Sequence, residues 1–217
     1  MIFFDIETLQ TNDESVIEEL RSTIEPPAQY KKPESIDKWM AENAEDRLNE
    51  LVAKTSLDGM YGRVACIAWA ANDPDPPSTH HLANEAEAIT EFYDYIENFS
   101  PHTDVFCGHN ITGFDLPFLK HRSMILGIRP PSVLLNAMNA KPWDACIADT
   151  MLMWSTDRHK MTSMKKLCKA FGIEYVDDMD GSMVAETWET DPQKVIEYCK
   201  NDVRRTREIY KRMTFEI

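Results

Sequence analysis

The sequence predicts an α/β fold in which helices cover both faces of a mixed five-stranded sheet. The first half carries three apolar runs that are typical of strands in a meander, and the second half alternates strands with amphipathic helices. The length of 217 residues and the hydrophobic content of 43% suit one domain with its own core. We therefore expect a single domain over residues 1–217.

The predicted meander begins at the N-terminus. Ile2–Ile6 is a short apolar run that contains Asp5 and is followed by Glu7, which is typical of a buried strand that reaches a polar edge. Val64–Ala71 is apolar throughout and is predicted to be a central strand. A shorter strand is expected near His80–Leu82, and it would complete the meander.

A mostly helical insertion is expected at about residues 10–57, between the first two strands. This segment is highly charged, and prolines interrupt it at Pro26-Pro27 and at Pro33. Beyond Pro33, apolar residues recur with helical spacing at Ile36, Trp39, Met40, Leu48 and Leu51.

The second half is predicted to alternate helices with short strands. Helices are expected where apolar residues follow a helical period, and their ends are marked by Gly172 and by the pair Asp191-Pro192. The predicted order is a helix at Glu85–Phe99, a strand at Asp104–Gly108, a helix after Asp115, a strand at Ala145–Ala148, a helix at Ser163–Phe171 and a terminal helix to about Arg212.

The charge distribution is uneven. The net charge is −14, whereas nucleic-acid-binding proteins usually carry a basic surface. Residues 1–60 hold 14 acidic and 6 basic residues, a net of −8, while residues 158–217 hold 12 basic and 11 acidic residues, a net of +1. The acidity is therefore concentrated in the N-terminal third, and nucleic acid is not excluded as a partner.

Cysteine usage and hydropathy indicate the compartment. The five cysteines are scattered, without a CxxC pair, which argues against a disulfide framework and against a thiolate zinc site. No export signal precedes the first strand, and no apolar run is long enough to cross a membrane. We therefore expect a cytoplasmic protein that does not associate with membranes.

Two carboxylates lie on the first predicted strand. Residues two apart on a strand face the same side, so Asp5 and Glu7 project together while Phe4 and Ile6 point into the core. Such a pair forms half of a cation site. The alternative is that both carboxylates are simply solvated at the strand end.

Two further segments place acidic residues on helices. Asp115 follows Gly108–Phe114 at a strand-to-helix transition, where it could also be an ordinary acid at a helix N-terminus. Tyr198 and Asp202 are four residues apart on the terminal helix and share one face. Taken alone, this pair is better interpreted as a partly buried tyrosine beside a surface aspartate.

Together, FDIET (residues 4–8), GHNITGFD (108–115) and YCKND (198–202) occur in the order of three known motifs. They resemble the exonuclease motifs of the DEDD (DnaQ-like) superfamily, in the subgroup whose third motif carries tyrosine (DEDDy). The likeness is greatest to the 3'-5' proofreading exonuclease domain of family B DNA polymerases, and it extends from Ile2 to about Tyr210. It implies a ribonuclease H-like fold. The insertion at about 10–57 departs from a minimal domain of this kind.

The resemblance implies a phosphodiester hydrolase with a two-metal-ion mechanism. Two divalent cations about 4 Å apart activate water, neutralise the phosphoryl oxygens and stabilise the leaving group. Mg²⁺ or Mn²⁺ prefers the oxygen ligands that four carboxylates supply. By the family pattern, Asp5 bridges both ions, Glu7 and Asp202 complete the nucleophile-side site, and Asp115 holds the second ion. Tyr198 would position the attacking water by a hydrogen bond.

The same resemblance implies contacts with the 3' end of a single strand or a frayed duplex. Thr8, Leu9, Asn110 and Phe114 match positions near that end, although Leu9 and Phe114 could equally be core residues. A basic track for the backbone would draw on Lys160, Lys165, Lys166, Lys169, Arg204, Arg205 and Arg207, and the alternative for these residues is a solvated helix face.

Three functions remain open at this point. The polymerase-like sequence pattern HNxxxFDxPFL favours a DNA exonuclease that releases nucleoside 5'-monophosphates. An exoribonuclease would use the same metal chemistry, so RNA is a possible substrate. The third alternative is a catalytically silent module that binds nucleic acid or a polymerase. These residues include no polymerase domain, so a proofreading role would require a separate DNA polymerase or replication protein.

Overall fold

The computed structural model describes residues 1–71, 77–80, 84–99, 105–141, 143–155, 161–176 and 179–216. Their centre is a mixed sheet with strand order β3-β2-β1-β4-β5. The first three strands pair antiparallel as a meander, and β4 and β5 run parallel to β1. The predicted mixed α/β fold is confirmed. The strands are β1 (Ile2–Leu9), β2 (Arg63–Ala70), β3 (Ser78–His80), β4 (Phe106–Gly108) and β5 (Ile147–Asp149).

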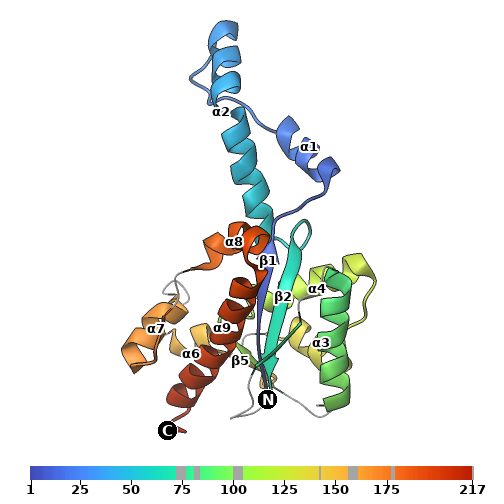
Figure 1. Ribbon diagram of the computed structural model, residues 1–217, viewed down its shortest axis with the longest axis vertical. Coiled ribbons are helices and arrows are strands. Elements are labelled where there is room, and N and C mark those ends of the chain that lie inside the picture. The colour runs from blue at the N-terminus through green and yellow to red at the C-terminus, as the bar shows by residue number, and fades with distance from the viewer. Residues whose placement is uncertain are drawn as a thin grey trace.

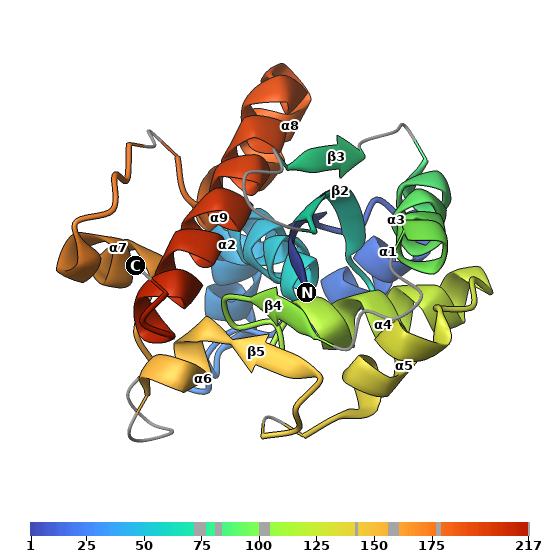
Figure 2. The same ribbon diagram turned by 90° about the horizontal axis from the view of Figure 1, so that it is seen from below.

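Three helices cover one face of the sheet: α3 (Glu85–Phe99), α4 (Asp115–Leu126) and α5 (Ser132–Asn139) (Figure 2). The core beneath them is aromatic. The ring centroid of Phe92 lies 5.4 Å from that of Phe4 and 5.3 Å from that of Trp69. Contacts of this kind add to the stabilisation that comes from burying the rings.

The opposite face is covered by α8 (Val184–Thr190) and α9 (Pro192–Met213) (Figure 2). Successive residues of a strand point to opposite faces, so Phe3 of β1 packs against α9 while Phe4 packs against α3. Two short helices, α6 (Thr150–Trp154) and α7 (Met164–Phe171), flank α9, and η1 (Thr55–Leu57) and η2 (Gly181–Met183) are single turns.

The helix ends follow the residues that predicted them. The side chain of Asp191 accepts a hydrogen bond from the Lys194 N–H, and Pro192 occupies the first turn of α9. Gly172 ends α7 in the left-handed conformation, with φ of 67°, which a residue without Cβ adopts at little cost. Both boundaries agree with the sequence-based expectation to within one residue.

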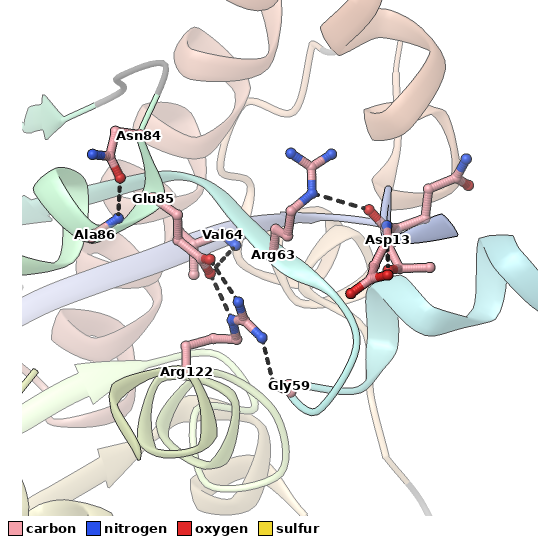
Figure 3. Close-up of polar contacts among 10 residues, drawn as sticks. Asp13, Gly59, Arg63, Val64, Asn84, Glu85, Ala86 and Arg122 are labelled. Atoms are coloured by element: carbon pink, nitrogen blue, oxygen red, sulfur yellow. Dashed lines mark hydrogen bonds and ion pairs between the residues drawn. The ribbon is translucent and has the colours of Figure 1, made fainter. Parts of the chain in front are cut away.

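A buried ion pair joins three elements on the α3 side (Figure 3). The Glu85 carboxylate accepts hydrogen bonds from Arg122 Nε and Nη2 at 2.9 and 2.8 Å, and from the Val64 N–H at 2.8 Å. Arg122 Nη1 also donates to the Gly59 carbonyl at 3.3 Å. The start of α3, the start of β2 and the middle of α4 are thereby tied together.

The segment between β1 and β2 forms an arm, defined as residues 13–54, that projects beyond one end of the sheet (Figure 1). It contains α1 (Glu14–Ser22) and α2 (Pro33–Lys54), which share a small core of Ile24, Leu48 and Val52. The Thr11 N–H donates to Thr55 Oγ1 at 2.8 Å, so the two ends of the arm lie side by side.

Several boundaries differ from the prediction. β5 begins at Ile147 rather than Ala145, because residues 143–146 form a turn in which the Ile147 N–H donates to the Asp144 carbonyl at 3.1 Å. β3 ends at His80, so the predicted continuation to Leu82 lies outside the described residues, as does Asp104 before β4. In the described part of the chain, no helix has the length and apolar character needed to cross a membrane.

Candidate active site

Asp5 and Glu7 lie on the side of β1 that faces α9. Phe4 and Ile6 point to the opposite side, into the core under α3, as the alternation of a strand requires. Only 9% of Glu7 is exposed. Both carboxylates therefore project from a buried strand into the space between the sheet and the terminal helix.

Asp115 approaches the same stretch of β1 from the first turn of α4. Its Oδ1 accepts a hydrogen bond from the Ile6 N–H at 3.1 Å, and only 3% of the residue is exposed. The pairing between β1 and β4 extends only over Ile2 and Phe3, so the Ile6 N–H lies beyond the end of β4. Asp115 therefore provides the hydrogen-bond acceptor for the Ile6 N–H, which has no partner on β4.

Tyr198 and Asp202 come from α9 and are buried next to β1. They are one helical turn apart and lie on one face, as predicted. Cys199 Sγ lies 3.4 Å from Asp5 Oδ2, which shows how closely α9 approaches the strand. Asp202 Oδ1 also pairs with Arg205 Nη1 at 2.8 Å.

The electrostatics show that these acidic groups share one site. Burial, followed by repulsion from Asp115 and Asp202, raises the pKa of Asp5 well above its ordinary value. Burial and then repulsion from Asp5 likewise raise the pKa of Glu7. Burial raises the pKa of Asp115 to about 7, although backbone hydrogen bonds oppose the shift. Concentrated negative charge of this kind is relieved by divalent cations.

Tyr198 is affected by the same cluster. Burial, followed by the negative charges of Asp202 and Glu7, raises the pKa of its phenol above the ordinary value. The phenol therefore stays protonated at neutral pH and can donate a hydrogen bond.

The donor set fits hard divalent ions. One oxygen each from Asp5 and Glu7 lies within 4.8 Å of the other and of Cys199 Sγ, which is close enough to surround one ion. Carboxylate oxygens are the ligands that Mg²⁺ and Mn²⁺ prefer, whereas a thiol suits softer metals. Asp115 and Asp202 lie near enough to Asp5 for their negative charges to raise its pKa.

A cavity of about 400 Å³ opens beside the carboxylates. Asp5, Tyr198 and Asp202 form one wall, and the other walls come from the loop after β4, from α6 and α7, and from the segment that precedes α8. The remaining lining residues are His109, Asn110, Met151, Ser163, Met164, Lys165, Tyr175 and Asp180.

The four residues predicted to contact the substrate differ in whether they reach the cavity. Asn110 lines this cavity, whereas Thr8, Leu9 and Phe114 do not. Thr8 Oγ1 donates to the Ser56 carbonyl at 2.7 Å, and Leu9 is buried against α8 and α9. Phe114 packs on Phe118 with ring centroids 5.6 Å apart. Leu9 is thus buried in the core and Phe114 is partly buried against it, and contact of these three residues with a substrate stays a prediction.

Only some of the basic residues predicted to contact the nucleic-acid backbone are exposed. Lys165 lines the cavity, and Lys166, Lys169 and Arg204 are exposed. Arg205 and Arg207 are buried, with 6% and 7% of their surface exposed, so they are not available to a nucleic-acid backbone. Arg205 instead pairs with Asp202 and stacks on the ring of Tyr175, 4.1 Å from its centroid. Lys160 lies outside the described residues.

Sequence reasoning did not single out Asp149 or Tyr175. Asp149 is buried at the end of β5 and is surrounded by hydrogen-bond donors. Its signal was an acidic residue between a strand and a helix start, the pattern that identified Asp115. Tyr175 lies in a segment without periodicity, and nothing in the sequence indicated that it reaches the cavity.

The fold and the site together define an α/β domain with a cluster of carboxylates between the first strand and the last helix, an arrangement suited to divalent metal ions. The chain belongs to a family described as predicted 3'-5' exonucleases related to the exonuclease domain of PolB, whose model matches residues 78–216. That match includes Asp115, Tyr198 and Asp202, while Asp5 and Glu7 precede it.

A solved structure shows the same fold. The chain is similar to the family B DNA polymerase from the hyperthermophilic archaeon Pyrobaculum calidifontis, with a TM-score of 0.59 and 19% sequence identity. The similarity covers 98% of this chain and 24% of the polymerase chain, so the protein corresponds to about a quarter of the polymerase. It supports the ribonuclease H-like fold. Among curated proteins, none matches the chain significantly.

Proposed function

We propose that the protein is a metal-dependent 3'-5' exonuclease that hydrolyses DNA, preferably from single-stranded 3' ends, and releases nucleoside 5'-monophosphates. The observation that supports it best is the convergence of Asp5, Glu7, Asp115 and Asp202 beside Tyr198, in a chain of a predicted exonuclease family. Buried carboxylates that raise one another's pKa are costly for stability, and they are typical of functional sites.

In this proposal, Asp5, Glu7, Asp115 and Asp202 would hold two Mg²⁺ or Mn²⁺ ions. Asp5 would be a ligand of both, Glu7 and Asp202 would be ligands on the nucleophile side, and Asp115 would serve the second ion. The ions supply Lewis-acid activation of water and charge neutralisation at the phosphate. Asp202 is held in place by its ion pair with Arg205, whose positive charge also offsets part of the negative charge on this side of the site.

Tyr198 is proposed to donate a hydrogen bond to the attacking water. Its raised pKa supports this role, because a protonated phenol cannot act as a general base. Deprotonation of the water is therefore assigned to metal coordination.

The substrate proposal rests on the shape and charge of the cavity. A volume of about 400 Å³ is of the size that small ligands fill, and it suits a terminal nucleotide. Lys165 offers a positive charge at its wall for a backbone phosphate. Similarity to part of a DNA polymerase favours DNA over RNA. A separate DNA polymerase or replication protein is the partner that this substrate implies.

The test uses single-stranded DNA and RNA of matched sequence, each labelled at the 5' or the 3' end, incubated with Mg²⁺, Mn²⁺ or EDTA. The proposal predicts stepwise shortening of 5'-labelled DNA, immediate release of a mononucleotide from the 3' label, and no reaction with EDTA. Preferential shortening of RNA would replace DNA as the substrate. Binding of either polymer without cleavage in any metal would show that the protein is a binding module.

A further inference from the structure

We infer that Asp149 is a positioning residue, which holds the loop that carries Asn110 against the 3' end of the substrate. The inference rests on the proposed exonuclease function. Asp149 is the last residue of β5 and is only 2% exposed, and it is not among the residues that line the cavity. Asp149 can therefore affect the reaction through the loop and the helix that it holds, or through its charge, which contributes to the raised pKa of Asp115.

One carboxylate gathers donors from the loop after β4. Asp149 Oδ1 accepts a hydrogen bond from the Asn110 N–H at 2.9 Å. Its Oδ2 accepts from the Thr112 N–H at 3.1 Å and from Thr112 Oγ1 at 2.6 Å. Because charged acceptors form the stronger hydrogen bonds, these three contacts restrain the loop more firmly than neutral partners would.

The same carboxylate begins α6. Oδ1 also accepts from the Met151 N–H at 3.0 Å and from the Leu152 N–H at 3.4 Å, which is the pattern of a helix N-cap. Asn110 and Met151 both line the cavity, and they come from different elements. Asp149 therefore fixes two walls of the cavity relative to each other.

The loop needs such a restraint because of its backbone. Asn110 has φ of 68°, in the left-handed region that residues other than glycine seldom occupy. Its side chain lies over Gly113, where a Cβ atom would come within 2.5 Å of Asn110 Oδ1. A conformation of this kind persists only when surrounding contacts determine it. Asp149 accepts from the Asn110 N–H, while the Asn110 carbonyl accepts from the N–H groups of Gly113 and Phe114, both at 3.0 Å.

The chemistry at Asn110 gives the restraint a function. An amide side chain at the cavity wall can donate and accept hydrogen bonds with a terminal nucleotide. A small displacement of a positioning group weakens substrate binding without changing the metal site. Asp149 is thus expected to affect the Michaelis constant more than the turnover number.

The test compares Asp149→Asn and Thr112→Val with the wild type. In Asp149→Asn, an NH2 group replaces one acceptor oxygen and faces N–H donors, whereas Thr112→Val removes one hydroxyl donor and keeps the N-cap of α6. Asp13→Asn is the matched control, because Asp13 caps α1 through the Ser15 N–H at 2.8 Å but lies on the exposed arm. Thermal unfolding of each variant sets an assay temperature at which all are folded.

The first readout is steady-state kinetics on single-stranded DNA. Asp149→Asn is expected to raise KM about tenfold or more, as supporting residues around a site commonly do, with kcat nearly unchanged. Thr112→Val should raise KM in the same direction by less, and Asp13→Asn should match the wild type. The second readout is the Kd in Ca²⁺ from a titration that follows the fluorescence of 2-aminopurine at the 3' terminus, and this Kd should be raised in both loop variants.

The outcomes separate the two proposals. If the wild type cleaves DNA and both loop variants match it in KM and in Kd, Asp149 has no positioning role although the exonuclease function stands. A loss of kcat at constant KM would also overturn the inference. If Asp149→Asn does not fold, Thr112→Val still decides the question. If the wild type neither cleaves nor binds a 3' end, the proposed function fails and the positioning role fails with it.

Discussion

The carboxylate of Asp115 accepts a hydrogen bond from the backbone N–H of Ile6, 3.1 Å away. Ile6 lies between Asp5 and Glu7, so this single contact fixes the first turn of α4 to the stretch of β1 that carries both acidic residues. The contact uses Oδ1 of Asp115 and leaves Oδ2 for other ligands. The second motif is thereby placed by the first, although 109 residues separate them in sequence.

The pH dependence of stability follows from the same residue. The pKa of Asp115 is raised to about 7 in the folded protein, compared with about 3.9 in an unfolded chain. The folded state therefore binds this proton more tightly, and the stabilisation is lost as the pH rises toward 7. The pKa values of Asp5 and Glu7 are raised as well, and they act in the same direction.

We therefore expect the free energy of unfolding of the metal-free protein to fall as the pH rises from about 4 to about 7. Urea unfolding in EDTA measures it, and adding Mg²⁺ or Mn²⁺ at pH 8 should restore stability because the ions bind only the folded state. Asp115→Asn keeps an acceptor for the Ile6 N–H and should flatten the pH profile. A profile that is flat in the wild type would contradict the assigned shifts.

Tyr198→Phe tests the role of the phenol. Removing a hydrogen bond to the attacking water is expected to lower kcat by about 10- to 100-fold, the usual range for groups that orient a metal-bound ligand. Metal binding should be unchanged, since the phenol is not a ligand. Pre-steady-state cleavage measures the effect, and kcat equal to that of the wild type would remove Tyr198 from the mechanism.

Arg122→Ala tests the ion pair that supports the α3 side of the sheet. The two side chains are only 9% and 12% exposed, so the variant leaves the Glu85 carboxylate buried and unpaired. A loss of about 3–5 kcal/mol in the free energy of unfolding is expected. Arg47→Ala is the control, since its pair with Glu50 is exposed at 49% and 60% and should contribute under about 1 kcal/mol. Equal losses in both variants would contradict this view.

Excision of the arm tests the domain organisation, in which we propose one exonuclease domain with an inserted arm. Residues 13–54 can be replaced by a short Gly-Ser linker because Thr11 and Thr55 are already in contact. The arm packs on its own small core, so cleavage of single-stranded DNA should persist. Removing 11 acidic and 6 basic residues, a net charge of −5, should tighten DNA binding at low salt. Circular dichroism checks folding, and inactivity of a folded variant would show that the arm serves the site.

The sequence predicted the long helices and the amphipathic α7 well, but it did not mark the other short helices of the second half. α2, α3 and α9 each have 15 or more residues, which gives the helical period enough repeats to be recognised. α5, α6 and α8 have 8, 5 and 7 residues, and no sequence pattern marked them as separate helices. Their positions depend on tertiary packing rather than on a local signal.

The site could be predicted where spacing alone determines geometry. Asp5 and Glu7 share one side of a strand, and Tyr198 and Asp202 share one face of a helix, in any fold that contains those elements. Burial of Arg205 was missed because a charged residue is expected at the surface. The spacing gave a hint, since Arg205 follows Tyr198 by two helical turns and lies on the same face.

The most direct test of the account measures metal binding and cleavage in the same samples. Mn²⁺ is titrated into the wild type, Asp5→Asn and Asp202→Asn while electron paramagnetic resonance follows bound ions and a 5'-labelled single strand reports hydrolysis from its 3' end. We expect two bound ions and cleavage in the wild type, with weakened ion binding and activity reduced by more than about 100-fold in both variants. Cleavage that persists in Asp5→Asn, or in EDTA, would contradict it.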